Sequence, residues 1–136
     1  MTEELAEVVL DGHAVSASAA RRFVASFLAS WGASHLADDA ALVASELVTN
    51  TVLHAGTGAR LVVRHAGGAV RIEVHDGSTN RPAAAEQGSA SAMTGRGLRV
   101  VQELAARWGV DPTEDGKSTW AELGSPTVFG RAEAGI

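Results

Sequence analysis

The sequence predicts an α+β fold, a two-layer α/β sandwich in which helices cover one face of a mixed, mostly antiparallel sheet. Two observations support this fold class. Alternating apolar residues on both sides of Gly67 and Gly68 indicate a tight hairpin of two antiparallel strands. Apolar residues at helical spacing, before and after the hairpin, indicate amphipathic helices. The expected order is strand, two helices, two strands, loop, helix and one or two strands, which suits a sheet covered on one face.

The first half of the chain is expected to contain one strand and two helices. The β-branched run at residues 7–10 is followed by a turn signal and predicts the strand. "SASAARRFVASFLASWG" opens with serine caps, repeats its apolar residues at helical spacing and stops at Gly32, which predicts the first helix. The second helix is expected over about residues 38–55, because Gly56 then ends the pattern.

The second half is expected to contain the hairpin, a loop, a third helix and a last strand. The hairpin strands are "ARLVVRH" and "AVRIEVHDG". Residues 79–94 are rich in proline, glycine and small polar residues without a sustained period, and a loop of this length is typical of a lid over a site. "LRVVQELAARWG" keeps helical spacing up to Gly109. "STWAEL", after a turn at Asp115 and Gly116, predicts the last strand.

Length, charge and cysteine content limit the classes of partner and site. The chain of 136 residues is expected to form one domain at residues 1–124, followed by a C-terminal tail at 125–136. Its formal net charge is -5, from 11 basic and 16 acidic residues, so no basic field is available to hold nucleic acid or an anionic membrane. The absence of cysteine excludes disulfides, thiolate metal sites and cysteine nucleophiles.

The start of the chain predicts the cellular location. "MTEELAEVVLDG" carries acidic residues where a signal peptide has basic ones, and it lacks the apolar segment that would follow. No apolar run in the chain approaches the roughly 20 residues that cross a bilayer. We therefore expect a cytoplasmic protein without a membrane partner.

"SELVTNTVLHAG" places a carboxylate and an amide among apolar residues of the second helix. Glu46 and Asn50 are separated by about 40° around the helix axis, inside an arc of apolar residues. An ionised glutamate is seldom fully buried without a partner, so this arrangement indicates a site. The alternative is that both side chains face water at the rim of the helix. His54 has no second metal ligand at zinc spacing, and the helix dipole alone favours it near the C-terminal end, so we expect a structural role.

Two further segments carry groups that suit a nucleotide. Asp76 ends a predicted strand next to Gly77, where a carboxylate can accept from the exocyclic amine of a purine; the alternative is an ordinary Asp-Gly turn. In "TGRGL", Gly95 and Gly97 stand at the entrance of a helix, whose free N–H groups favour a phosphate, and Arg96 could add a charge-assisted contact. A hinge without a ligand would explain the same glycines.

"DPTEDGKS" looks like the end of a phosphate-binding P-loop but does not match that motif. The P-loop requires a glycine five residues before Gly116, and this chain has Asp111 there. It also requires a helix to follow, whereas "STWAEL" predicts a strand.

Taken together and in order, these motifs resemble the GHKL superfamily, whose ATP-binding domain is the Bergerat fold. Within it, the chain is most similar to stand-alone bacterial anti-sigma-factor serine/threonine kinases of the actinobacterial type. "SELVTNTVLHA" resembles the N box, "VHDGS" the first glycine box, "GRGLRVVQELAARWG" the second glycine box, and "GKSTWAEL" the closing strand. The likeness covers most of residues 7–123, and the motifs are specific as a set although each is weak alone.

The resemblance implies ATP and Mg²⁺ as cofactors and assigns roles to residues. Asn50 would hold the Mg²⁺ that bridges the ATP phosphates, and Glu46 would polarise the attacking hydroxyl. Asp76 would accept from the adenine amine. Ser118, where many relatives have threonine, would support Asp76 or a water at the adenine. The glycine boxes add Ser78, Gly95, Arg96, Gly97 and Leu98 to the nucleotide site.

The chain departs from the superfamily pattern in the first glycine box. Ser78 and Asn80 stand where histidine kinases and gyrase-type relatives have glycine. Serine at the first position is common in the anti-sigma group, whereas Asn80 is expected to restrict the entry to the lid.

Two functions follow from the resemblance. In the first, the protein uses ATP to phosphorylate a serine or threonine of a STAS-type anti-sigma-factor antagonist, binds that antagonist or a sigma factor, and regulates transcription by partner switching. In the second, it is a non-catalytic, ATP-gated module that sequesters a regulatory protein. The presence of both Glu46 and Asn50 favours the kinase, because a module that only senses nucleotide does not need the glutamate. A homodimer is compatible with either function.

Overall fold

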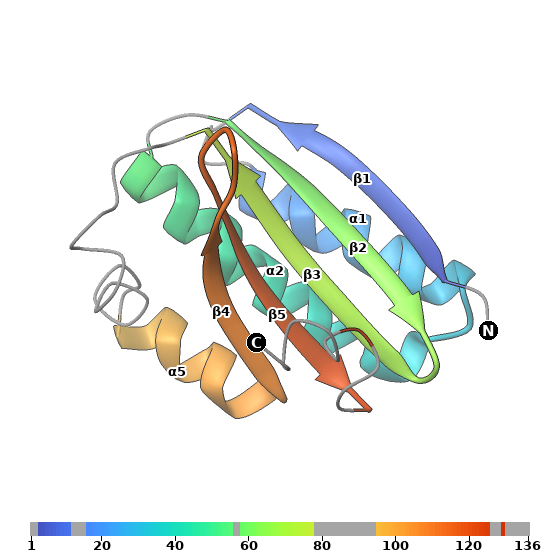
Figure 1. The fold of residues 1–136 in the computed structure, drawn as a ribbon. Coiled ribbons are helices and arrows are strands. Elements are labelled where there is room, and N and C mark those ends of the chain that lie inside the picture. The colour runs from blue at the N-terminus through green and yellow to red at the C-terminus, as the bar shows by residue number, and fades with distance from the viewer. Residues whose placement is uncertain (1–2, 12–15, 56–57, 78–94, 126–128, 130–136) are drawn as a thin grey trace.

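One layer of the molecule is a five-stranded sheet. The structure, a computed structural model, describes residues 3–11, 16–55, 58–77, 95–125 and 129 (Figure 1). The strand order is β1-β2-β3-β5-β4, and each of the four neighbouring pairs is antiparallel. The strands are β1 (Glu4–Leu10), β2 (Ala59–Ala66), β3 (Ala69–Asp76), β4 (Arg107–Pro112) and β5 (Lys117–Gly124).

Helices form the second layer and cover one face of the sheet. They are α1 (Ser16–Ser30), α2 (Ser34–Ala55) and α5 (Gly95–Leu104). In Figure 1, α1 and α2 lie behind the sheet, α5 extends beyond its β4 edge, and the other face of the sheet is turned toward the viewer. The two-layer α+β arrangement predicted from the sequence is therefore confirmed. None of the described helices is both long enough and apolar enough to cross a membrane.

α2 is the central helix of this layer. It contacts α1 on one side, α5 on another, and strands β2, β3 and β5 beneath it. Because neighbours surround it, its residues are buried around most of its circumference, and Val43, Leu47 and Val48 have no exposed surface. A helix that is surrounded in this way is apolar on nearly every side, so buried polar residues on it are unusual.

The hairpin between β2 and β3 forms as the sequence predicted. Ala66 pairs with Ala69, so Gly67 and Gly68 alone make the turn. Their φ angles are 54° and 82°, and the two positive values are those of a type I′ turn, which glycine adopts without strain.

Three predicted boundaries are wrong. β1 begins at Glu4, three residues before the expected start, and α2 begins at Ser34 instead of Asp38. The larger error lies after the third helix, which ends at Leu104 and not at Gly109; residues 107–112 instead form β4.

The formation of β4 is a tertiary effect. The N–H of Ala105 still donates to Val101, as in a helix, whereas the N–H of Ala106 donates to the carbonyl of Glu122 on β5. From that point the chain pairs with β5. Trp108, an apolar residue of the helical pattern, packs against the core from β4. A strand therefore buries the side chain that was expected to be buried by a helix. Pairing with a neighbouring strand thus overrides the helical spacing.

Phe129, in the predicted tail, is half-buried. The predicted lid at 79–94 lies outside the described residues, as does most of the predicted tail.

Candidate functional site

Three segments that carry predicted site residues gather at one end of the molecule. The C-terminal ends of α2 and β3 lie at the same end in Figure 1, and the chain leaves β3 there. α5 begins on that side of the view, and α2 contacts both β3 and α5. The fold therefore places the C-terminal ends of α2 and β3, which carry Asn50 and Asp76, at the same end of the molecule, and α5 begins on that side.

Glu46 and Asn50 are buried. Each retains 8% of its accessible surface, whereas Thr49, between them in sequence, is exposed. The alternative that both side chains face water at the helix rim is therefore wrong. Asn50 Oδ1 is completely buried and accepts no hydrogen bond. A buried acceptor without a partner loses its hydration without compensation, which costs about 1–3 kcal/mol. Such an atom is typical of a position that a ligand completes.

The donor set at this position suits Mg²⁺. An amide oxygen is a ligand that this hard cation accepts, and protein sites for Mg²⁺ commonly use one or two side chains together with substrate phosphates. Among the described residues, no three histidine, aspartate or glutamate side chains gather as a metal cluster. A single buried amide oxygen at Asn50 fits an ion that is held mainly by the phosphates of a nucleotide.

Asp76 lies at the end of β3 and pairs with Lys117, the first residue of β5. Directly opposed residues of an antiparallel pair share a face. Since Val74 and its partner Thr119, two residues along, lie on the buried face with the core, Asp76 and Lys117 point to the helix side. Lys117 Nζ is 3.0 Å from Asp76 Oδ2, and this contact is an ion pair whose angles are not those of a hydrogen bond. The Asp76 side chain has 0% exposed surface and that of Lys117 has 14%.

Gly116 holds the β4–β5 turn close to this pair. A Cβ at this position would lie 2.8 Å from Gly77 Cα and would overlap the carbonyl oxygen of Asp76. Only glycine permits this approach. The turn itself is closed by a 2.9 Å hydrogen bond from the N–H of Thr113 to the Gly116 carbonyl.

Ser118 does not share this face. It pairs with His75, so its side chain points to the face away from the helices, although it is buried. The structure therefore does not bring the side chains of Ser118 and Asp76 together, and Lys117 lies beside Asp76 instead.

The remaining predicted site residues are described only in part. Gly95 is the first residue of α5, and Gly97, two residues further, is buried. The side chains of Arg96, Leu98 and His54 lie outside the described part of the chain, and Ser78 lies outside it altogether.

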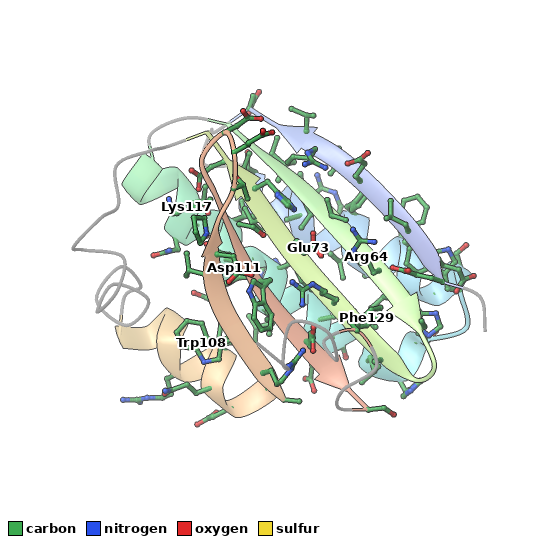
Figure 2. The ribbon with its side chains drawn as sticks, viewed as in Figure 1. Arg64, Glu73, Trp108, Asp111, Lys117 and Phe129 are labelled. Atoms are coloured by element: carbon green, nitrogen blue, oxygen red, sulfur yellow. The ribbon has the colours of Figure 1, made fainter. Side chains whose placement is uncertain are left out.

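The charged residues of the opposite face form a network of their own. Figure 2 shows Arg64 and Glu73 on the face turned to the viewer. Glu73 Oε2 accepts from Nε of Arg64 at 3.0 Å and of Arg71 at 2.7 Å, and its Oε1 lies 2.8 Å from His75 Nε2. Burial alone would raise the pKa of Glu73, but hydrogen bonds from His75 and Arg71 and the charges of both arginines lower it below its usual value.

Glu122 completes this network on β5. Its Oε1 accepts from Arg107 Nε at 3.0 Å and Nη2 at 2.8 Å, and its Oε2 accepts from Arg71. The guanidinium of Arg71 also lies 4.4 Å from the ring centroid of Trp120. Gly109 on β4 pairs with Trp120. A Cβ at Gly109 would approach Trp120 Cζ2 to 2.9 Å, so a larger residue would crowd the indole.

Lys117 is the residue of this region that sequence reasoning missed. It occurs in the Gly-Lys-Ser triplet that we set aside as an imperfect P-loop. One signal was present, because Lys117 is the only lysine in the chain. Its position beside Asp76 depends on the register between β3 and β5, which the sequence alone does not give.

Comparison with known proteins places the fold. Of the solved structures that resemble it, one contains the RsbU and RsbW domains of Rv1364c from Mycobacterium tuberculosis, with a TM-score of 0.66 and 23% sequence identity. The match covers 90% of this chain and 33% of that one, so this chain spans about a third of the length of its structural relative. At this identity the likeness shows the fold alone. No curated protein matches the sequence.

The sequence also matches a protein family over most of its length. Residues 12–123 match the family of histidine kinase-like ATPase domains. The match includes α2 with Glu46 and Asn50, β3 with Asp76, the whole of α5 and the hairpin of β4 and β5. The chain therefore belongs to the histidine kinase-like ATPase domains of the GHKL superfamily.

Proposed function

We propose that this domain binds Mg-ATP at the end of α2 and β3 and uses it to phosphorylate a serine or threonine of a STAS-type anti-sigma-factor antagonist. The same surface or a neighbouring one would bind that antagonist or a sigma factor, so that transcription is regulated by partner switching in the cytoplasm. Family membership supports nucleotide binding. The likeness of the sequence motifs to anti-sigma-factor kinases supports the partner class and the chemistry.

The buried, unpartnered Oδ1 of Asn50 is the observation that carries this proposal. Along one of the most buried helices of the fold, a polar atom without a partner lowers stability and is expected to persist only where a ligand uses it. Mg²⁺ bound with ATP would supply charge neutralisation for the transferred phosphoryl group. Asn50 would act as an amide ligand of this ion.

Glu46, one turn earlier on α2, is the proposed general base. It would orient the hydroxyl of the incoming serine or threonine and take its proton during transfer. Burial beside apolar residues reduces competition from water for this carboxylate. Asp76 would accept from the exocyclic amine of adenine, and Gly95 and Gly97, at the start of α5, would allow the phosphates to approach backbone N–H groups.

Two substitutions on α2 test the division of roles. Glu46→Ala should slow phosphotransfer to a cognate STAS-type protein by roughly a hundredfold or more, the usual contribution of a general base, and should leave ATP affinity nearly unchanged. Asn50→Ala should weaken Mg-ATP binding as well as transfer, because a metal ligand acts in the ground state and the transition state. Calorimetry gives the affinities, and radiolabelled phosphate transfer gives the rates.

Thr49→Ala is the matched control. Thr49 lies on the same helix between the two residues but is exposed, so this variant should keep wild-type affinity and rate. If the wild-type protein binds ATP and a partner but transfers no phosphate to it, the kinase assignment is wrong and the domain is an ATP-gated binding module.

A further inference from the structure

The carboxylate assigned to adenine recognition is covered by the only lysine of the chain. Asp76 and Lys117 are directly opposed on β3 and β5, and both point to the helix side of the sheet. Lys117 Nζ lies 3.0 Å from Asp76 Oδ2. The ammonium group therefore occupies space that an amine of a bound base would need in order to reach this oxygen.

The Asp76 side chain is completely buried in this arrangement. The Asp76 side chain has 0% exposed surface, so no ligand atom can touch its carboxylate while its surroundings keep this arrangement. The Lys117 side chain retains 14%, which means that it reaches the surface while Asp76 does not. Binding of a base to Asp76 requires at least one of the covering groups to move.

The backbone around Asp76 is less able to move than the lysine side chain. Gly116 packs so tightly on Asp76 and Gly77 that even a single Cβ would not fit, and β3 and β5 are hydrogen-bonded through this position. Lys117, by contrast, has a four-carbon stem with free rotation and a well-hydrated ammonium group. Swinging this side chain to solvent breaks one ion pair and no sheet hydrogen bond.

We propose that Lys117 is a gate residue, which closes the purine-binding carboxylate of the nucleotide-free protein and is displaced into solvent when a purine nucleotide with an exocyclic amine binds. This inference rests on the proposed function, because it takes Asp76 as the acceptor for the base. The inference adds a competition between the base and Lys117 for the Asp76 carboxylate. Nucleotide affinity then depends on the free energy of the hydrogen bond gained at Asp76, reduced by the free energy of the ion pair lost with Lys117.

Amine labelling reports the position of this gate. Because the chain has a single lysine, modification by an amine-reactive ester is read at one side chain by mass spectrometry of the peptide that contains it. In the wild-type protein Lys117 should react slowly without nucleotide and about tenfold faster with saturating Mg-ADP, the change expected when a charge-assisted contact is released. Asp76→Asn should react fast in both conditions.

Affinity gives the second test. Lys117→Met removes the ammonium but keeps the length of the side chain, and it should bind Mg-ADP about tenfold more tightly than wild type. Lys117→Arg keeps the ion pair and should stay near wild type. Arg60→Met changes the net charge equally on an exposed side chain of β2 and should have no effect, which controls for long-range electrostatics.

The outcomes separate this inference from the proposed function. If wild type binds Mg-ADP but the labelling rate of Lys117 does not rise, or if Lys117→Met binds more weakly, the lysine is not displaced and the gate is wrong, while the nucleotide site stands. If neither wild type nor Lys117→Met binds nucleotide, both fail. Labelling of the wild-type chain keeps the test valid even if Lys117→Met does not fold.

Discussion

The two faces of the sheet use polar residues in opposite ways. On the face away from the helices, Glu73 and Glu122 each bind two or more cationic side chains, and the network extends across four strands through Arg64, Arg71 and Arg107. On the helix-covered face, Asp76 has Lys117 at 3.0 Å, and Asn50 Oδ1 accepts no hydrogen bond.

The comparison distinguishes polar groups that pair with one another within the fold from a polar group that lacks a partner in it. On the open face, a buried carboxylate is balanced by several donors, so the network stabilises the sheet without a ligand. The indole N–H of Trp120 is the one buried side-chain donor there that lacks a partner among the described residues. On the covered face, the apolar core surrounds Asn50 Oδ1, a buried acceptor without a hydrogen bond, and such an atom is typical of a position that a ligand completes.

The largest expected effect on stability comes from truncating an apolar side chain in the core between the sheet and the helices. Leu61 on β2 points into the core and has no exposed surface, so Leu61→Ala should lower the free energy of unfolding by about 2–5 kcal/mol. Leu5 on β1 lies on the open face and is 49% exposed, so Leu5→Ala should change it by less than about 0.5 kcal/mol. Urea denaturation measures both. Equal losses would mean that the open face is also a packed core.

Carboxylate-to-amide changes on the two faces should separate nucleotide binding from stability. Asp76→Asn should weaken ATP binding by about a hundredfold, because an amide presents one acceptor and an NH₂ group where the base amine needs an acceptor. Glu73→Gln, on the open face of the same strand, should leave ATP affinity unchanged. Calorimetry at one magnesium concentration compares them. A similar loss in both variants would show a general effect on folding.

Glu122 tests the stability of the open-face network. Glu122→Gln keeps the shape of the side chain but removes the charge that Arg71 and Arg107 share, and should cost about 2 kcal/mol of unfolding free energy. Thermal and urea unfolding provide the measurement. A variant as stable as wild type would mean that the network contributes specificity of pairing and no net stability.

Acid should reveal the same network through Glu73. The folded-state pKa of Glu73 is below its ordinary value of 4.5, so its contribution is fully present above that value and is lost as pH falls through the lower folded pKa. Unfolding free energy measured from pH 6 to pH 3 should therefore fall less steeply in Glu73→Gln than in wild type. Parallel curves would contradict this assignment.

The smallest expected effect concerns the exposed pair of Glu7 and Arg60. Both side chains are 49% exposed although their atoms are 2.7 Å apart, so Glu7→Gln should cost less than about 0.5 kcal/mol, and added salt should remove that cost. Comparing it with Glu122→Gln isolates the effect of burial on the same chemistry. A cost near that of Glu122→Gln would show that exposure does not weaken ion pairs on this sheet.

Local patterns in the sequence determined most of the fold. Gly67 and Gly68 predicted the β2–β3 hairpin because a type I′ turn requires two residues with positive φ, and this is a property of the turn itself. The spacing of Glu46 and Asn50 predicted that they share one side of a helix, since four residues make about one turn. Their burial was not determined in the same way, because it depends on α5 and the sheet packing around α2.

Tertiary structure decided which residues meet at the site. Trp108 continues the helical spacing of the preceding residues, but residues 107–112 pair with β5, because the edge of β5 offers hydrogen bonds that a continued helix cannot use. The register between β3 and β5 places Lys117 beside Asp76 and turns Ser118 to the other face. A slip of one residue would exchange these two side chains, since successive residues of a strand point to opposite faces. Forty residues separate the two strands, so no local pattern fixes that register, and only the packed sheet selects the lysine as the neighbour of the carboxylate.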